Sequence, residues 1–130
     1  SVLHLTHQGK HINLLDTPGA PDFLGNALTA LSAVETVLIT VSAANGVEVN
    51  TRRMFAEAGK RGLARMIAIT KLDHENARFD EVYAAIRESF GKACVLFNAP
   101  VGVGPKMSAV VDLVHPPASP PAGLAIDVAD

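Results

Sequence analysis

Short apolar runs alternate along the chain with stretches whose apolar residues recur at helical spacing. Near the N-terminus, one run begins at Val2 and a second extends from His11 to Leu15, on either side of Gln8-Gly9-Lys10. Two such runs around a short glycine-containing turn predict a β-hairpin. Residues 36–43 form a continuous, mostly β-branched run, which is typical of a strand buried on both faces. Residues 66–70 predict a further strand.

Three helices are expected between and after these strands. Asp22 is a suitable N-cap for the first, and the second is expected from about Val49 to Gly59, with Gly59 or Gly62 ending it. The third ends at Gly91, and its apolar residues share one face, which favours core packing over a cofactor site. Those residues are Phe79, Val82, Tyr83, Ile86 and Phe90. Because strands that alternate with helices pair in parallel, we expect a doubly wound, mostly parallel α/β sheet with the hairpin as its antiparallel edge.

Two tetrapeptides carry the candidate chemistry, and each directly follows a predicted strand. Asp16-Thr17-Pro18-Gly19 follows the second strand of the hairpin, and Thr70-Lys71-Leu72-Asp73 follows the strand at 66–70. An open α/β sheet binds its ligands at the carboxyl ends of its strands. Asp16 could hold a magnesium ion, usually through water, and Gly19 would let a backbone N–H approach a terminal phosphate. Asp73 could accept two hydrogen bonds from the edge of a guanine base, with the stem of Lys71 along the base plane.

Each tetrapeptide also has an ordinary structural interpretation. The first could be a strand-to-turn segment in which Pro18 fixes φ, and the second a strand end followed by Asp73 as a helix cap. Their order, their strand contexts and the helix, strand and helix between them favour the functional interpretation.

The stretch from His11 to Asp73 resembles the GTP-binding domain of the translational GTPases, and specifically that of elongation factor G and its bacterial elongation-factor-G-like paralogues. The first tetrapeptide with Asp22-Phe23 is similar to the switch II segment of the family. Residues 99–102 and 109–114 resemble the start of the subdomain that elongation factor G inserts into its GTP-binding domain. The resemblance covers residues 2–115.

This resemblance implies a partial P-loop-NTPase-type fold, with residues 1–92 as part of the GTP-binding domain, 93–115 as the start of the inserted subdomain and 116–130 as a Pro-rich linker or tail. It also implies GTP or GDP and Mg²⁺ as ligands of the intact protein, the ribosome as its partner and the cytoplasm as its location. The implied nucleotide-binding residues are Asp16, Thr17, Pro18, Gly19, Thr70, Lys71 and Asp73, with Asp16 also facing the metal.

The sequence lacks the glycine-rich phosphate loop G-x-x-x-x-G-K-(S/T). Residues 102–108 are only superficially similar, because their glycines are wrongly spaced and Pro105 removes an N–H donor. In the resembled family this loop follows a central strand, so we expect the chain to be an excised piece without the P-loop strand and to bind GTP poorly by itself. We also expect the neighbouring strands to present unpaired edges that favour self-association.

Two residues depart from the family pattern. Ala20 stands where the translation factors have the His that orients the attacking water, so no catalytic residue is assigned. Thr70 stands where the guanine motif usually begins with Asn, and its hydroxyl replaces only part of the hydrogen bonding of the amide. This second departure resembles the elongation-factor-G-like paralogues.

Composition adds little to this picture. The net charge of −2 over 130 residues gives no electrostatic sign of nucleic-acid binding, and the single Cys94 lies in an apolar run that favours a buried structural thiol. The most apolar stretch, from Leu31 to Val49, is too interrupted by polar residues to span a bilayer. Exposed strand positions explain the hairpin histidines without a metal. They are His4, His7 and His11.

Three functions are compatible with the sequence. The first is an elongation-factor-G-like GTPase that acts with the ribosome, for which enzymatic activity is expected only in the full-length protein. The second is a degenerate GTPase-fold protein that binds nucleotide or a partner without turnover, and Ala20 is its main support. The third treats the motifs as accidents in a metabolic α/β enzyme, although no nucleophile with a base supports it.

Overall fold

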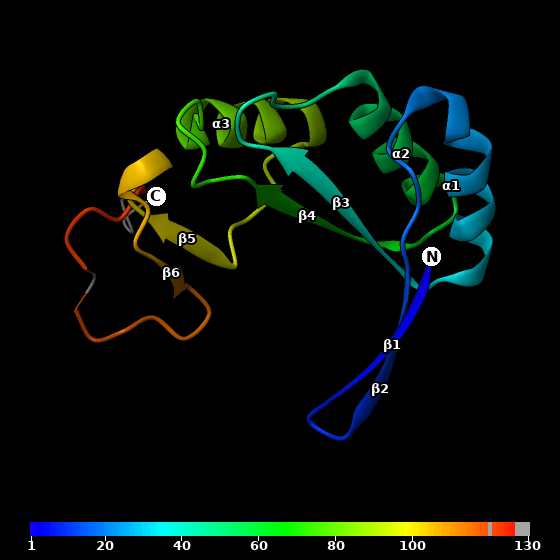
Figure 1. Ribbon diagram of the computed structural model, residues 1–130, viewed down its shortest axis with the longest axis horizontal. Helices are drawn as coiled ribbons and strands as arrows, with labels where there is room; N and C mark the ends of the chain where they lie inside the picture. Colours follow the sequence, from blue (N-terminus) through cyan, green and yellow to red (C-terminus); the bar gives the residue numbers. More distant parts are fainter. Residues whose placement is uncertain (120, 127–130) are drawn as a thin grey trace.

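The computed structural model describes residues 1–119 and 121–126 of the chain. Strands and helices alternate, as the hydrophobic pattern predicts (Figure 1). The strands are β1 (Val2–His7), β2 (Lys10–Leu15), β3 (Thr36–Ser42), β4 (Ala64–Thr70), β5 (Asn98–Val101) and β6 (Ala109–Asp112). The helices are α1 (Leu24–Ala30), α2 (Val49–Lys60) and α3 (Phe79–Phe90), with short 3-10 turns at Pro21–Phe23, Leu31–Ala33 and Gly104–Lys106.

The six strands form three separate pairs. Strands β1 and β2 are antiparallel, β3 and β4 are parallel, and β5 and β6 are antiparallel. The mixed α/β class with a parallel pair and an N-terminal hairpin is therefore confirmed. The hairpin is not hydrogen-bonded to the parallel pair, however, and projects away from the helices (Figure 1). No strand of the described residues lies between β2 and β3 to join them.

The hairpin turns through Gln8 and Gly9, whose φ values are 48° and 74°. Positive φ at both central residues is the geometry of the two-residue turns that match the twist of β-hairpins. The register pairs Leu3 with Leu14 and Leu5 with Ile12, which places these four apolar side chains on one face. All residues of β1 and β2 are exposed, so this apolar face is uncovered among the described residues.

The parallel pair and its helices hold the core. Val41 of β3 packs with Val82 and Ile86 of α3, and Phe90 and Cys94 join this cluster from its margin. The predicted apolar face of α3 is thus confirmed as core packing, and Cys94 is partly buried there. Helices α2 and α3 lie on the same side of the pair (Figure 1).

The opposite face of the parallel pair is open among residues 1–119 and 121–126. Leu38 of β3 is paired with Met66 of β4, and these side chains are 58% and 44% exposed. A parallel sheet is normally covered on both faces. The helices present here cover only one of them.

The start of α1 and the end of α2 differ from the predicted helix ends. The predicted capping by Asp22 is wrong, because Pro21–Phe23 form a 3-10 turn and α1 begins only at Leu24. Helix α2 continues through Gly59, and the chain leaves it at Gly62, where φ is +71°. Helix α2 begins with a capping box in which the Glu48 side chain accepts from the backbone N–H of Thr51 and the Thr51 hydroxyl accepts from the N–H of Glu48.

Residues 123–125 lie along the edge of β5 that β6 does not occupy. Gly102 N–H donates to the C=O of Gly123 over 2.8 Å, and Ala125 N–H donates to the C=O of Pro100 over 3.0 Å. The predicted tail at 116–130 includes residues 120 and 127–130, which lie outside the described residues. The division at residues 92 and 115 stays a prediction. Among the described residues, no helix is both long and apolar enough to cross a membrane.

Candidate functional site

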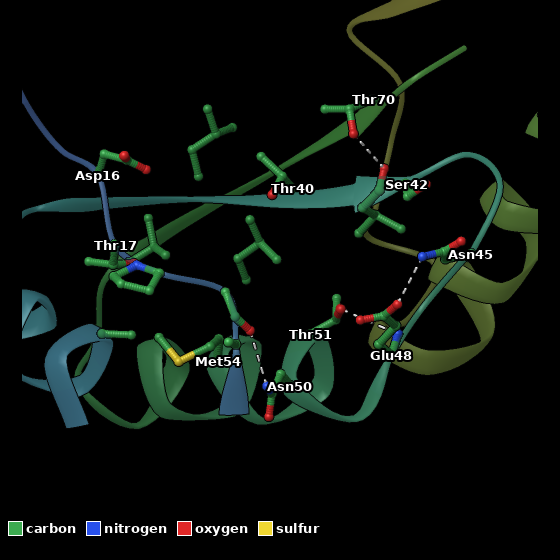
Figure 2. Close-up of a pocket in the computed structure, with 18 of the residues that line it drawn as sticks. Asp16, Thr17, Thr40, Ser42, Asn45, Glu48, Asn50, Thr51, Met54 and Thr70 are labelled. Atoms are coloured by element: carbon green, nitrogen blue, oxygen red, sulfur yellow. Dashed lines mark hydrogen bonds between the residues drawn. The ribbon is translucent and has the colours of Figure 1, made fainter. Parts of the chain in front are cut away.

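A cavity of about 450 Å³ separates β3 from the segment that follows β2, with α1 and α2 forming its floor (Figure 2). The lining combines residues 15–20 at and after the end of β2, residues 37–42 of β3, residues at the start of α2, and Thr70 at the end of β4 with Lys71. Both predicted ligand segments therefore reach the same cavity.

Asp16 continues the hairpin ladder by one residue. Its N–H donates to the C=O of Ser1 over 2.8 Å, and the Ser1 ammonium donates to the C=O of Asp16 over 2.7 Å. These bonds fix the backbone of Asp16, whereas its side chain is exposed and lines the cavity. The carboxylate is thus placed to accept a ligand or a hydrated cation.

Gly19 and Ala20 form the part of this segment that approaches α2. The C=O of Gly19 accepts a hydrogen bond of 3.3 Å from Asn50 Nδ2, which ties the segment to the first turn of α2. A Cβ placed on Gly19 would meet no atom within 4 Å, so the protein itself does not require glycine there. Ala20 precedes the 3-10 turn, and its C=O accepts from Phe23 N–H over 3.0 Å.

Thr70, the last residue of β4, and Lys71, which follows it, form the wall of the cavity at the end of this strand. The C=O of Thr70 accepts from Ala43 N–H over 2.8 Å, which extends the parallel ladder past the end of β3. The Thr70 hydroxyl donates to the C=O of Val41 over 3.4 Å. Lys71 has a φ of 57°, a left-handed conformation that costs a non-glycine residue about 1–2 kcal/mol. Strain of this kind is frequently found at functional sites.

Asp73 is exposed and lies outside the cavity lining. The two ligand segments also stand apart, because Asp16 and Thr70 occupy opposite ends of the cavity (Figure 2). Sequence reasoning assumed that both strands end at one edge of a single sheet. The separate hairpin carries Asp16 away from that arrangement.

Helix α2 supplies polar lining residues that the sequence analysis did not single out. They are Glu48, Asn50 and Thr51, joined by Asn45, whose Nδ2 donates to Glu48 Oε1 over 3.3 Å. The Asn45-Gly46 turn and a Glu three residues before a Thr are the signals that could have located them. Because Glu48 already accepts from the first-turn N–H of Thr51, the start of α2 presents a capped, acidic end to the cavity.

The described residues match a GTP–magnesium complex only in part. They contain no cluster of three or more His, Cys, Asp or Glu that could enclose a metal. Mg²⁺ bound to nucleotides needs only one or two carboxylates besides phosphate oxygens and water, and the free carboxylate of Asp16 meets that need. The capped end of α2 offers no phosphate cradle, and the sequence has no phosphate loop. The lining thus offers a carboxylate suited to a hydrated metal ion but no cradle for phosphates.

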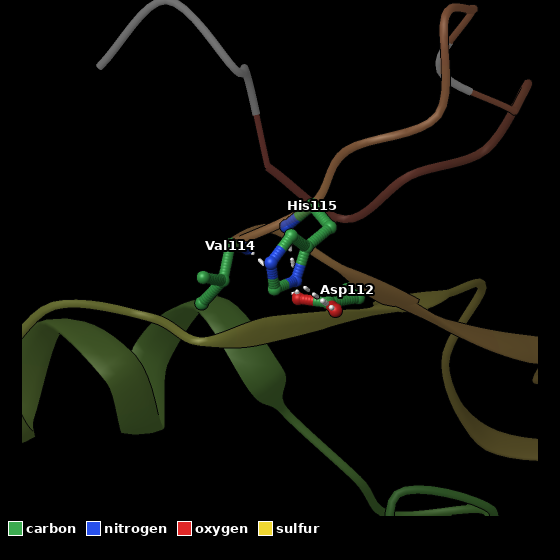
Figure 3. A network of polar contacts seen from close by, with 3 residues as sticks. All are labelled: Asp112, Val114 and His115. Carbon is green, nitrogen blue, oxygen red and sulfur yellow. Dashed lines mark hydrogen bonds and ion pairs between the residues drawn. The ribbon is translucent and has the colours of Figure 1, made fainter.

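A separate polar network lies at the end of β6 (Figure 3), and none of its residues lines the cavity. Asp112 Oδ1 accepts from Val114 N–H over 2.8 Å, and Oδ2 lies 3.2 Å from His115 Nδ1. The backbone N–H of Val114, followed by the side chain and N–H of His115, lowers the pKa of the Asp112 carboxyl. Both side chains are exposed, so the network closes the end of a strand and forms no enclosed site.

The chain matches the family described as the elongation factor Tu GTP binding domain over residues 1–116. It is 31% identical over 115 residues to peptide chain release factor 3 of Lactococcus lactis, covering 88% of this chain and 22% of that protein. It is 35% identical over 104 residues to the elongation factor G-like protein of Mycobacterium tuberculosis, covering 80% and 15%. A crystal structure of a protein from Thermus thermophilus matches with a TM-score of 0.77 and 34% identity, over 85% of this chain and 16% of that chain. The chain thus spans about a fifth or less of the length of these relatives.

Proposed function

Since this chain belongs to the family of elongation factor Tu GTP-binding domains, a part of the translational GTPases, we propose that it forms the guanine-recognising and magnesium-facing part of the nucleotide site of an elongation-factor-G-like GTPase. The family membership excludes the interpretation of the two motifs as accidents in a metabolic enzyme. Relatives named release factor 3 and elongation factor G-like protein are both similar to the chain. The guanine motif of this chain begins with Thr70, and this form favours the elongation-factor-G-like role.

The observation that carries this proposal is the convergence of the two strand-end segments on one cavity. Asp16 and Gly19 line it from one side, and Thr70 and Lys71 from the other. Lys71 holds a left-handed backbone conformation two residues before Asp73, the residue that would accept hydrogen bonds from guanine. In this proposal, Lys71 contacts the base plane, Asp16 faces the hydrated magnesium ion, and Gly19 approaches the terminal phosphate.

Tight binding requires a phosphate loop from sequence beyond these 130 residues. Charge-assisted hydrogen bonds contribute about 1.5–3 kcal/mol each, so several missing phosphate contacts would weaken binding by several powers of ten. Joining the hairpin to a complete sheet would also bring Asp16 to the same edge as Thr70. The proposal therefore assigns GTP binding, hydrolysis and action on the ribosome in the cytoplasm to the longer protein.

Calorimetry with GDP on the 130-residue chain and on the full-length protein tests this assignment. We expect tight binding only in the full-length protein, and we expect Asp73→Ala to weaken that binding at least tenfold, because about 1.5–3 kcal/mol is lost with each charge-assisted bond. Glu75→Ala is the matched control, since Glu75 is an exposed carboxylate two residues away and does not line the cavity that Asp16 and Thr70 share. Micromolar GDP binding by the 130-residue chain would contradict the argument from the phosphate loop.

A second candidate function is nucleotide-dependent partner binding without turnover. Ala20 favours this candidate, because the methyl group that follows Gly19 can neither donate a hydrogen bond to an attacking water nor accept one from it. The two candidates share the same nucleotide site and differ only in hydrolysis by the full-length protein. Its hydrolysis rate with and without ribosomes distinguishes them.

A further inference from the structure

The turn that follows β5 contacts the guanine motif at residues 70–73, although the two are far apart in the sequence. The N–H of Gly104, the first residue of the 3-10 turn between β5 and β6, donates to the C=O of Leu72 over 2.7 Å. Leu72 directly precedes Asp73. Because Gly104 is buried, water competes little for this bond. The turn thus holds the backbone of the motif at the residue before the proposed base-binding carboxylate.

Gly104 also approaches the backbone on the other side of Asp73. A Cβ placed on Gly104 would lie 3.3 Å from the carbonyl oxygen of His74 and 3.9 Å from the Cα of Glu75. The first distance is tighter than an ordinary van der Waals contact, and backbone atoms cannot turn aside as a side chain can. The φ of Gly104 is +66°, a conformation that favours glycine. The turn therefore requires glycine for its own conformation and for its fit against the motif.

The guanine motif needs such support because its backbone is strained. Lys71 holds a φ of 57°, and a strained conformation persists only where the surrounding structure fixes it. Within the loop, the C=O of Lys71 accepts from His74 N–H over 3.2 Å, which is a longer bond than the one that Gly104 donates. Gly104 therefore supplies a restraint from outside the loop, on the residue that follows the strained one.

The other end of the same loop is fixed to the residues that follow β3. Arg78 N–H donates to the C=O of Ala43 over 2.9 Å, and the Arg78 guanidinium donates to the C=O of Ala44 over 3.0 Å. Asp73 lies in the chain between this anchor and the bond at Leu72, and its side chain is exposed. An exposed side chain has few contacts to orient it, so the position of the Asp73 carboxylate depends on the backbone that the two anchors hold.

We propose that Gly104 is a positioning residue for guanine recognition, an inference that rests on the function proposed above. Its turn holds the backbone at Leu72 and His74. Asp73, between them, is thereby kept in the place from which its carboxylate accepts a hydrogen bond from the exocyclic amine of guanine. Selectivity for guanine thus depends on the packing of the β5–β6 pair against the motif, and not on residues 70–73 alone.

The ratio of the dissociation constants for inosine diphosphate and GDP, measured by calorimetry on the full-length protein, tests this proposal. Hypoxanthine lacks the exocyclic amine, so the ratio reports the hydrogen bond from that amine to Asp73. The Cβ of Gly104→Ala would push the turn away from the motif. We expect this variant to lower the preference for GDP at least about fivefold, because a hydrogen bond to a charged group contributes about tenfold or more and is weakened here rather than removed. A loss of stability alone would affect both nucleotides equally and leave the ratio unchanged.

The matched control is Gly62→Ala. Gly62 has a φ of +71°, but a Cβ there would meet no atom within 4 Å, so this variant acquires a similar backbone strain without contact to the guanine motif. It should bind the two nucleotides with the wild-type ratio. Asparagine adopts positive φ more readily than alanine, so Gly104→Asn, with Gly62→Asn as its control, replaces the first pair if Gly104→Ala does not fold.

Hydrogen exchange of the nucleotide-free full-length protein tests the contact independently of nucleotide binding. We expect Gly104→Ala, and not Gly62→Ala, to speed exchange in residues 71–77 at least about fivefold, which corresponds to the loss of one hydrogen bond from a locally opening loop. Unchanged exchange in these residues overturns the proposal, because the turn would then not hold the loop.

The two measurements together separate this proposal from the proposed function. A wild type without preference for GDP over inosine diphosphate contradicts the proposed function, and the positioning role with it. A wild type that prefers GDP, together with an unchanged ratio in Gly104→Ala, overturns the positioning role alone. If exchange is faster in that case, the contact at Gly104 only attaches the β5–β6 pair to the rest of the chain.

Discussion

In the proposed nucleotide site, Ala20 stands where the resembled family has the histidine that orients the attacking water. It directly follows Gly19 and lines the cavity beside Asp16. A group that positions or polarises water contributes about a hundredfold to ten-thousandfold to a reaction rate. We therefore propose that the full-length protein is a slow GTPase by its own means and that its nucleotide-bound state is long-lived.

We expect Ala20→His to raise ribosome-stimulated hydrolysis by the full-length protein at least about tenfold, since general-base groups contribute this much or more. Single-turnover hydrolysis of wild type and variant, with and without ribosomes, measures the effect. A wild-type rate equal to that of a histidine-bearing elongation factor would refute the interpretation of Ala20 as the catalytic gap.

Lys71 combines a strained backbone with a proposed contact to the base. Glycine has no Cβ to oppose a φ of 57°, so Lys71→Gly should raise the free energy of unfolding of the 130-residue chain by up to about 1 kcal/mol. In the full-length protein the same change should weaken GDP binding, because the stem along the base plane is lost. Lys71→Ala is the matched control, since it removes the stem but keeps the Cβ. Urea unfolding and calorimetry measure the two effects, and a stability gain for alanine equal to that for glycine would argue against backbone strain.

At the scale of single elements, periodicity and turn chemistry were reliable guides. The hairpin, the parallel strands and α3 are where the apolar pattern predicts them, because each is determined by local alternation or by helical spacing. The start of α1 was missed, since Asp22 suits a helix cap but Pro21 instead starts a 3-10 turn. The side chain alone does not specify which of these two short geometries follows.

The end of β6 provides a test of local electrostatics. Asp112 accepts hydrogen bonds from Val114 and His115, and these bonds lower the pKa of its carboxyl. Because the folded-state pKa is lowered, the stabilisation that the charged carboxylate gives is present above its unfolded pKa and is lost as the pH falls through the folded one.

We expect NMR titration to give Asp112 a pKa below the ordinary aspartate value. His115→Ala should move this pKa part of the way back, because the N–H of Val114, the largest cause, remains. A pKa unaffected by His115→Ala would show that the side chain of His115 does not contribute.

At the scale of the whole molecule, pairing between elements was less predictable than the elements themselves. The sequence indicated which segments are strands. One continuous sheet, however, also requires that each of its inner strands pairs with a strand on both sides. No strand of the described residues pairs with the free edge of β3, so the hairpin stands apart and Asp16 lies far from Thr70 across the cavity. The residue types of the site were predictable from motifs, whereas their separation depends on this missing pairing. The polar residues at the start of α2 were missed because they belong to a helix cap, which has no ligand signature of its own.

In the proposed function, Asp73 recognises guanine in the full-length protein. Guanine presents N–H groups on the edge that faces the carboxylate, and these groups would donate hydrogen bonds to it. Xanthine presents a carbonyl oxygen in place of the exocyclic amine. Replacing the carboxylate by an amide supplies a donor for that oxygen. The most direct measurement is therefore the ratio of dissociation constants for GDP and xanthosine diphosphate in the full-length wild type, in Asp73→Asn and in the control Glu75→Gln. We predict that wild type and Glu75→Gln prefer GDP and that Asp73→Asn prefers xanthosine diphosphate, with a change in the ratio of at least about a hundredfold, since two charge-assisted bonds are exchanged. An unchanged preference for GDP in Asp73→Asn would contradict the assignment of this chain as the guanine-recognising part of a GTPase.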